Sequence, residues 1–201
     1  MRLKMIKCLM AVALIICMVQ YAVAQEEGEL NFQTTEQGII KSLTAESPKI
    51  KTRSLGEIKT RSIKIVGREN NQIIQQEITV TDDAPAQSVN LKIEFNVNSF
   101  NIRPDSYDLL NKLGKALTSE KLKEKAILIK GHTDSDGNDD YNLTLSLNRA
   151  QAVKSHLVGR FSIPESTIKV YGYGKTMPLA PDNNPANKQL NRRVEIAVDE
   201  N

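Results

Sequence analysis

From residue 88 onward, the spacing of apolar residues changes repeatedly between two periods, and this alternation restricts the fold more than any other feature. Apolar and polar side chains alternate along residues 89–95, which is the pattern of a strand with one buried face. Along residues 104–117, apolar side chains recur three and four positions apart, which indicates a helix with one buried stripe. Pro104 is typical of the first turn of such a helix. The chain therefore needs a fold in which helices pack on a sheet.

The same alternation continues toward the C-terminus. Residues 126–129 form an uninterrupted apolar run, which favours a strand covered on both faces. Residues 140–158 predict a second helix with Asp140 as its N-cap. Residues 168–174 and 194–198 predict two further strands, separated by a loop rich in Pro and Asn. The order βαβαβ(loop)β predicts an α/β sandwich, a mixed sheet with helices packed on it, over residues 88–201.

The first 24 residues have the pattern of a secretory signal peptide. Three basic residues precede the apolar run of residues 8–19, and small residues ending at Ala24 indicate cleavage there. A retained membrane anchor is the alternative, but the run is shorter than the roughly 20 residues that a membrane span needs. We therefore expect a secreted mature chain that begins at Gln25.

Removal of this leader changes the charge and the cysteine content. The chain has 27 basic and 24 acidic residues, and the leader takes three basic ones, which leaves a mature chain without net charge. A nucleic-acid partner is not expected for such a chain. Cys8 and Cys17 leave with the leader, so the mature chain cannot form a disulfide. Neither cysteine follows the Leu-small-small pattern of a lipid-acceptor site.

Residues 25–87 predict a largely disordered, flexible arm, because polar residues dominate and apolar ones are scattered. A short repeat lies within it, since residues 50–55 recur almost unchanged as residues 58–63. The repeat is explained by a duplicated linker or by a docking tag for an acidic partner, such as another envelope protein. Residues 63–66 and 73–80 can pair as a hairpin, which we expect to form only if it docks on the following domain.

One carboxylate and one guanidinium form the candidate ligand site. Asp134 follows the end of the second strand, and Arg149 lies two turns beyond Asn142 on the same helix face. A carboxylate can accept an ammonium group, and an arginine fork can hold a carboxylate, so the pair suits the end group of an amino acid. On spacing alone, a structural ion pair between Asp134 and Arg149 explains the pattern as well.

Residues 89–198 resemble the OmpA-like (OmpA/MotB C-terminal) peptidoglycan-binding domain. The resemblance covers about 110 of 201 residues, in order and at the spacing of the family. One departure is Asn96, where the family more often has Asp, and we interpret this position as support for a turn. The segments that carry the resemblance are residues 95–99, 131–134 with Gly137, 141–150, 170–174 with Pro178, and 191–196.

The resemblance implies non-covalent binding of the diaminopimelate in the peptidoglycan stem peptide. By similarity, Asp134 receives the ammonium group and Arg149 holds the neighbouring carboxylate. The other positions that the resemblance assigns are Asn98, Thr133 and Asn142, which line the same pocket, and Asn191 and Arg192, which support it.

Three other kinds of site are disfavoured. A zinc site would need more ligands than His132 and His156, because the mature chain has no cysteine. The acidic loop 134–140 lacks the twelve-residue frame and the closing Glu of a calcium loop. Hydrolysis of peptidoglycan would need a pair of carboxylates or a nucleophile with a base. We expect no enzyme activity, no metal and no cofactor.

The sequence therefore predicts a cell-wall-associated periplasmic protein that is tied to the outer membrane, if at all, through a partner. The alternative is an envelope module that binds another protein, with wall binding secondary.

Overall fold

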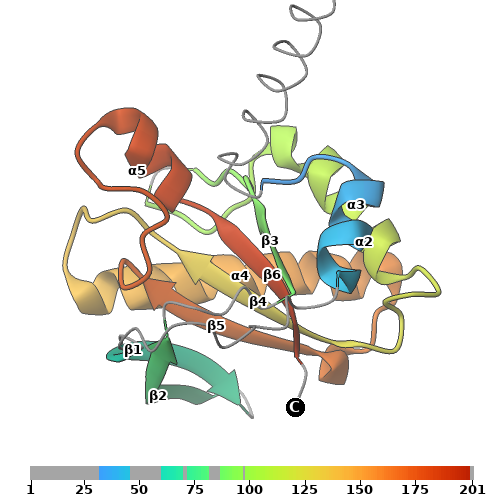
Figure 1. Cartoon of the computed structure of the whole chain (residues 1–201), viewed down its shortest axis with the longest axis horizontal. Helices are drawn as coiled ribbons and strands as arrows, with labels where there is room; N and C mark the ends of the chain where they lie inside the picture. The colour runs from blue at the N-terminus through green and yellow to red at the C-terminus, as the bar shows by residue number, and fades with distance from the viewer. Residues whose placement is uncertain (1–31, 46–59, 70–71, 82–86, 97, 200–201) are drawn as a thin grey trace, which may run out of the picture. The chain divides into compact units, whose positions relative to one another are not determined.

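The computed structural model describes residues 32–45, 60–69, 72–81, 87–96 and 98–199. The described strands form one six-stranded sheet in the order β2-β1-β5-β4-β6-β3 (Figure 1). The parallel pair is β4 with β5, whereas β6 is antiparallel to both β4 and β3. The predicted mixed sheet is thus confirmed. The strands are β1 Thr60–Glu69, β2 Gln72–Thr81, β3 Ser88–Leu91, β4 Ala126–His132, β5 Ile168–Gly174 and β6 Val194–Asp199.

The final strand of the chain, β6, lies between β3 and β4 in the sheet. The first two strands of the predicted βαβαβ order are therefore parallel but not neighbours, because β6 pairs with both of them. The next two strands, β4 and β5, are direct neighbours joined through a helix. This arrangement brings residues near the C-terminus next to the end of β4.

Four described α-helices accompany the sheet: α2 Glu36–Thr44, α3 Tyr107–Leu117, α4 Asp139–Phe161 and α5 Pro185–Asn191. Short 3-10 turns, Pro104–Ser106 and Glu165–Thr167, precede α3 and β5. The predicted N-cap of α4 was wrong by two residues, because the side chain of Asn138, not of Asp140, accepts a hydrogen bond from the Tyr141 N–H at 2.8 Å. The sequence did not predict α2 or α5, which are short.

The main core contains one stripe from each of α2, α3 and α4 together with alternate residues of the strands. In β4, Ile127 and Ile129 are buried, whereas Leu128 is only half-buried. The strand was predicted to be covered on both faces, and the face of Leu128 is covered only in part. The stripe predicted for α4 is buried at every position, namely Leu143, Ser146, Leu147, Ala150, Val153 and Leu157.

Parts of the N-terminal arm join the domain. Helix α2 starts at the N-cap Thr35 and buries Ile39 and Leu43 completely or almost completely in the core. Strands β1 and β2 form the predicted hairpin, with Ile63 opposite Ile78. The hairpin docks on the sheet through pairing of β1 with β5. A second, smaller cluster of Ile63, Ile65 and Tyr173 lies at this junction.

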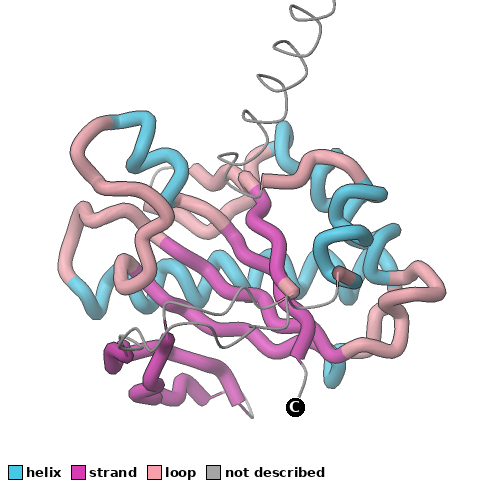
Figure 2. The backbone as a smooth tube through the Cα atoms, in the orientation of Figure 1, coloured by secondary structure: helices cyan, strands magenta, loops and turns pink. Residues whose placement is uncertain are grey.

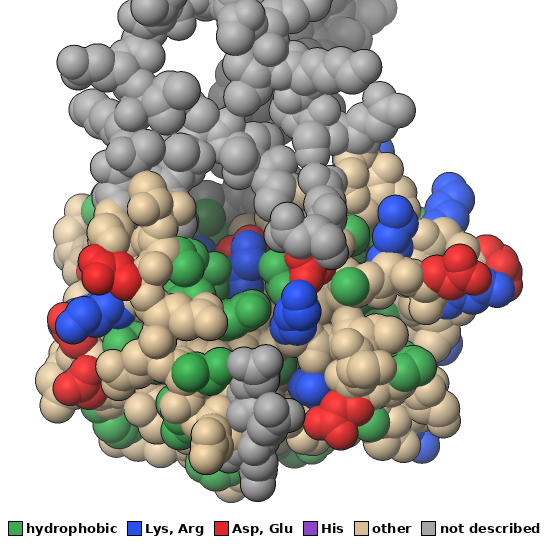
Figure 3. Space-filling view, turned by 90° about the horizontal axis from the view of Figure 1, so that it is seen from below, with side chains coloured by type: hydrophobic (Ala, Val, Ile, Leu, Met, Phe, Trp, Pro, Cys, Tyr) green, Lys and Arg blue, Asp and Glu red, His purple; other side chains and the backbone are tan. Residues whose placement is uncertain are grey.

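Several predictions concern residues outside the described ones. These are the signal peptide with Cys8 and Cys17, the first copy of the repeat, and the boundary near residues 82–86. Among the described residues, no helix combines the length and apolar character needed to cross a membrane. On the face shown in Figure 3, acidic and basic side chains lie next to one another rather than in a patch of one sign.

Candidate functional site

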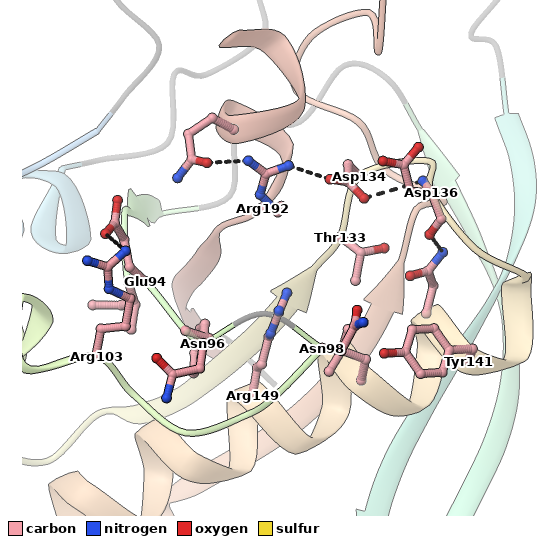
Figure 4. A pocket seen from close by; sticks show the side chains of 15 residues that line it. Glu94, Asn96, Asn98, Arg103, Thr133, Asp134, Asp136, Tyr141, Arg149 and Arg192 are labelled. Carbon is pink, nitrogen blue, oxygen red and sulfur yellow. Dashed lines mark hydrogen bonds and ion pairs between the residues drawn. The ribbon is translucent and has the colours of Figure 1, made fainter. Parts of the chain in front are cut away.

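The loop after β4 and the N-terminal half of α4 face the loop after β3 across a cavity of about 450 Å³ (Figure 4). Asp134 and Thr133 come from the end of β4, and Asn142 and Arg149 come from α4. Residues at four separate positions in the sequence thus meet at one edge of the sheet, where strand ends and a helix N-terminus converge. The lining consists of Ile93, Glu94, Phe95, Asn96, Asn98, Arg103, Thr133, Asp134, Asp136, Tyr141, Asn142, Leu145, Arg149, Gln189 and Arg192.

Close packing of α4 on the sheet fixes the site. The backbone of α4 lies directly over Gly131 of β4 and Gly172 of β5, where any side chain would collide with helix backbone atoms. The Gly174 N–H also donates to the Ser146 hydroxyl at 2.9 Å. The glycines of the two sequence motifs therefore allow the approach that holds Arg149 at the cavity.

Arg149 is a buried cation, with only 8% of its surface exposed. Its guanidinium carbon lies 5.0 Å from the centre of the Phe95 ring, and its Nε–H donates to the Ser99 carbonyl at 3.1 Å. Burial lowers the pKa of Arg149, and the negative charge of Asp134 opposes this effect. Within the described part of the chain, Arg149 forms no ion pair, and Figure 4 shows its guanidinium pointing into the cavity.

Asp134 has a partner other than the one that the spacing suggests. Its Oδ2 forms an ion pair with Arg192, and its Oδ1 accepts a hydrogen bond from the Asp136 N–H at 3.3 Å (Figure 4). Among the described residues, Asp134 and Arg149 therefore do not form the direct ion pair that was the alternative explanation of their spacing. Arg192, which the resemblance places in a supporting position, contacts Asp134 itself and also donates to Gln189.

The remaining predicted residues take different positions. Thr133 is buried, and its hydroxyl has no hydrogen-bond partner among the described residues. Asn142 donates to the Asp136 carbonyl at 2.8 Å and so holds the loop after β4. Asn98 is exposed at the rim, with φ of 50°. Asn191 is fully buried outside the lining.

The buried amide of Asn191 organises the loop that follows β5. Its Oδ1 accepts from the Leu179 and Ala180 N–H groups at 2.7 and 3.0 Å, and its Nδ2 donates to the Ala180 carbonyl at 2.7 Å. A buried polar group with its hydrogen bonds satisfied in this way fixes the backbone around it. Asn191 thereby positions Arg192, its neighbour, beside Asp134.

Sequence reasoning missed some residues that line the cavity. Tyr141, Gln189 and Asp136 were not singled out as ligand contacts. Tyr141 precedes Asn142 in a matched motif, and this position was a usable signal. Gln189 lies in α5, which the sequence did not predict, and only the fold brings it to the site.

The ionised residues of the cavity are mostly paired. Glu94 lies 3.3 Å from Arg103, Asp134 pairs with Arg192, and Asp136 pairs with Lys188. The acidic loop after β4, which has some likeness to a calcium loop, thus meets basic side chains. Across the described ranges, no cluster of three or more His, Cys, Asp or Glu side chains is placed to hold a metal ion.

His132 lies beneath the site rather than in it. It is 1% exposed, and its Nε2 lies 3.3 Å from Glu195, which also accepts from Lys130 at 2.9 Å. Burial lowers the pKa of His132 to about 4, helped by the positive charge of Arg193 and opposed by Glu195. The imidazole is therefore neutral at pH 7.

We expect His132 to make the protein less stable in mild acid. As the pH falls below 6.5, the unfolded chain binds a proton at this residue before the folded chain does, so stability is lost until pH 4. The full difference corresponds to about 3 kcal/mol, of which about 2 kcal/mol falls between pH 6.5 and pH 5. Urea denaturation at pH 7 and pH 5 measures this loss.

His132→Gln removes the titrating group and should flatten this dependence. His156→Gln is the comparison, because His156 is only half-buried although burial also lowers its pKa. Equal loss of stability in the parent chain and in His132→Gln would contradict the assignment.

Comparison with known proteins identifies the family of this chain. The model of the family described as "OmpA family" matches residues 94–192. The outer-membrane lipoprotein YfiB of Pseudomonas aeruginosa is 31% identical over 124 residues, which cover 62% of this chain and 72% of YfiB. The chain belongs to the OmpA family. The resemblance predicted from the sequence motifs is confirmed, and the matched residues include every one of the predicted site residues.

Other OmpA-family relatives are longer. Outer membrane porin F of Pseudomonas aeruginosa is 31% identical over 111 residues, 55% of this chain and 31% of that protein. The peptidoglycan-binding protein ArfA of Mycobacterium tuberculosis is 33% identical over 109 residues, 53% of this chain and 32% of ArfA. This chain thus spans about a third of the length of these two relatives. The crystal structure of the peptidoglycan-associated lipoprotein from Burkholderia pseudomallei is 28% identical, with a TM-score of 0.48, over 53% of this chain and 88% of that one.

Proposed function

We propose that this protein binds peptidoglycan non-covalently in the periplasm and recognises the diaminopimelate of the stem peptide. The observation that carries the proposal is the state of Arg149. It is a buried guanidinium that faces the cavity, and among the described residues it has no anionic partner, whereas the other charged residues nearby are paired. A buried cation without a partner is costly, so the site favours a ligand that brings a carboxylate.

The rest of the cavity suits the ammonium group of a zwitterionic ligand. Asp134 uses one oxygen for Arg192, and a carboxylate has lone pairs for further donors, so it can also accept an ammonium group. The Thr133 hydroxyl is available for a hydrogen bond at the same end. The printed name of ArfA adds support, because that relative is described as peptidoglycan-binding.

We assign no chemical step to this site. Its two aspartates, Asp134 and Asp136, are paired with the basic side chains of Arg192 and Lys188. The arrangement holds a ligand and leaves its bonds unchanged.

Competition with two stem peptides tests the proposal. A peptide with lysine in place of diaminopimelate keeps the ammonium group and lacks the terminal carboxylate, so it offers nothing to Arg149. We expect the diaminopimelate peptide to displace the protein from purified sacculi, and the lysine peptide to need about 100-fold higher concentration, as for loss of a buried charge partner.

Asp134→Asn should weaken the binding of the diaminopimelate peptide and of the lysine peptide by the same factor, since both peptides present the ammonium group. Equal potency of the two peptides in the parent chain would refute the diaminopimelate assignment. Failure of both peptides to compete, with envelope proteins still captured, would instead support the protein-binding alternative.

A further inference from the structure

Among the described residues, the outer edge of β2 has no strand partner. Strand β2 stands at the end of the sheet and pairs with β1 along its whole length, from Thr60 opposite Thr81 to Glu69 opposite Gln72. No strand of the described residues pairs with its other side, as Figure 2 shows at the hairpin. Every second residue of β2 therefore directs its N–H and C=O groups away from β1, toward a place where a further strand fits.

This edge also lacks the features that keep exposed edges apart. The strand Gln72–Thr81 contains no proline and no basic residue, and its single charged residue, Glu77, accepts a hydrogen bond from Ser62 at 2.6 Å. Ile73 is 52% exposed. By contrast, the strand at the opposite edge, β3, has only four residues and is bridged at Asn90 by Phe32. A ten-residue edge with one charged side chain favours a paired strand.

The sequence of β2 is nearly symmetric about Gln76. Residues at equal distances from Gln76 are Ile74 and Ile78, then Gln75 and Glu77, then Ile73 and Thr79. In an antiparallel pair of identical strands related by a two-fold axis perpendicular to the sheet, residues at equal distances from the axis lie opposite each other on the same face. An axis at Gln76 therefore matches the two pairs nearest to it in polarity, Gln75 with Glu77 and Ile74 with Ile78, whereas Ile73 lies opposite Thr79.

Neighbouring positions of the axis are less favourable. An axis at Gln75 would place Ile73 opposite the carboxylate of Glu77, and an axis at Glu77 would place two carboxylates opposite each other. Like charges directly opposite each other destabilise a strand pair. Of these three registers, the one with its axis at Gln76 avoids both contacts.

We propose that β2 pairs antiparallel with β2 of a second copy of this chain around a two-fold axis at Gln76, which joins the two sheets. On one face, Ile74 and Ile78 of each copy would meet, and Ile78 already packs against the cluster of Ile63, Ile65 and Tyr173. The pairing does not depend on what the cavity binds. It goes beyond the proposed function because a dimer carries two cavities and gains affinity for a polymeric ligand through multivalency.

Two substitutions at one exposed position test the register. Gln75 lies opposite Glu77 of the partner subunit in the proposed pair, and this contact occurs twice. Gln75→Lys creates two attractive pairs and should lower the dimer dissociation constant about threefold to tenfold, whereas Gln75→Glu should raise it by a similar factor. Sedimentation equilibrium of the full chain measures both constants, and the difference should shrink at high salt.

Cysteine crosslinking locates the axis independently. In a chain whose Cys8 and Cys17 are replaced by serine, Gln76→Cys should form a disulfide-linked dimer under mild oxidation, because this residue faces its own copy. Thr79→Cys should not, since it faces Ile73 of the partner subunit. A monomer at all concentrations, equal effects of the two Gln75 variants, or equal crosslinking at both positions would overturn the proposal.

Discussion

Arg149→Ala is expected to lower the affinity for purified sacculi by about two orders of magnitude. The guanidinium is buried at the cavity and stacked on Phe95, so its fork is already oriented before the ligand arrives. Truncation removes the charge-assisted hydrogen bonds to the ligand carboxylate and leaves that carboxylate buried without a partner, which typically costs 2 kcal/mol or more. Binding isotherms with sacculi at fixed salt measure the effect.

Two further variants separate charge from geometry. Arg149→Lys keeps a positive charge but loses the planar fork, so it should bind between the parent and Arg149→Ala. Arg160→Ala removes an exposed arginine from the last turn of the same helix and should bind like the parent. The proposal fails if Arg149→Ala is correctly folded by circular dichroism and still binds within a factor of two of the parent.

Gly172→Ala is expected to destabilise the domain by about 3 kcal/mol, because overpacking of a tight contact typically costs 1 to 3 kcal/mol and the opposing atoms here are backbone. An added Cβ would lie 2.6 Å from the Leu147 nitrogen and closer still to the Leu143 carbonyl oxygen. Neither atom can rotate away, so α4 must shift from the sheet. Urea denaturation followed by circular dichroism measures the free energy of unfolding.

The same helix supplies a control in the opposite direction. Gly159 has no atom within 4 Å of the position of an added Cβ, and it lies inside α4. Gly159→Ala should therefore stabilise the protein by about 0.5 to 1 kcal/mol through higher helix propensity. Destabilisation of Gly172→Ala and Gly159→Ala by the same amount would show that α4 is not held against β5 as described.

A shift of α4 should also change the geometry of the cavity. Asn142 and Arg149 lie on this helix, and the Ser146 hydroxyl accepts the hydrogen bond from Gly174 between them. Any folded fraction of Gly172→Ala should consequently bind sacculi less tightly than the parent. The glycine that permits close packing thus also supports the binding geometry.

Local patterns were sufficient for most of the elements after residue 88. Strand β5 begins and ends at the predicted residues, and α4 buries the predicted stripe, because the periods of 2 and 3.6 residues are properties of the backbone that each segment expresses alone. The motifs also placed the chain in its family and selected six of the residues that line the cavity, whereas the predicted Asn191 lies outside the lining. The helix α2 was missed because a nine-residue segment with few apolar residues gives a weak periodic signal.

Contacts between distant segments needed the tertiary structure. Sequence spacing left open an ion pair between Asp134 and Arg149 as an alternative to a ligand clamp, but the insertion of β6 beside β4 brings Arg192 to that carboxylate. Arg149 is thereby left as the cation that faces the cavity without an ion pair among the described residues. Likewise, the pairing of β1 with β5 turned a marginal hairpin into part of the sheet and left β2 as its edge. The sequence alone determined most of the strands and helices after residue 88, but not α2 or α5, and it indicated the carboxylate and the guanidinium of the site. Which strands are neighbours, and therefore which charges neutralise each other, was decided by the packing of the whole chain, because strand pairing and ion pairing depend on distance in space and not on separation in sequence.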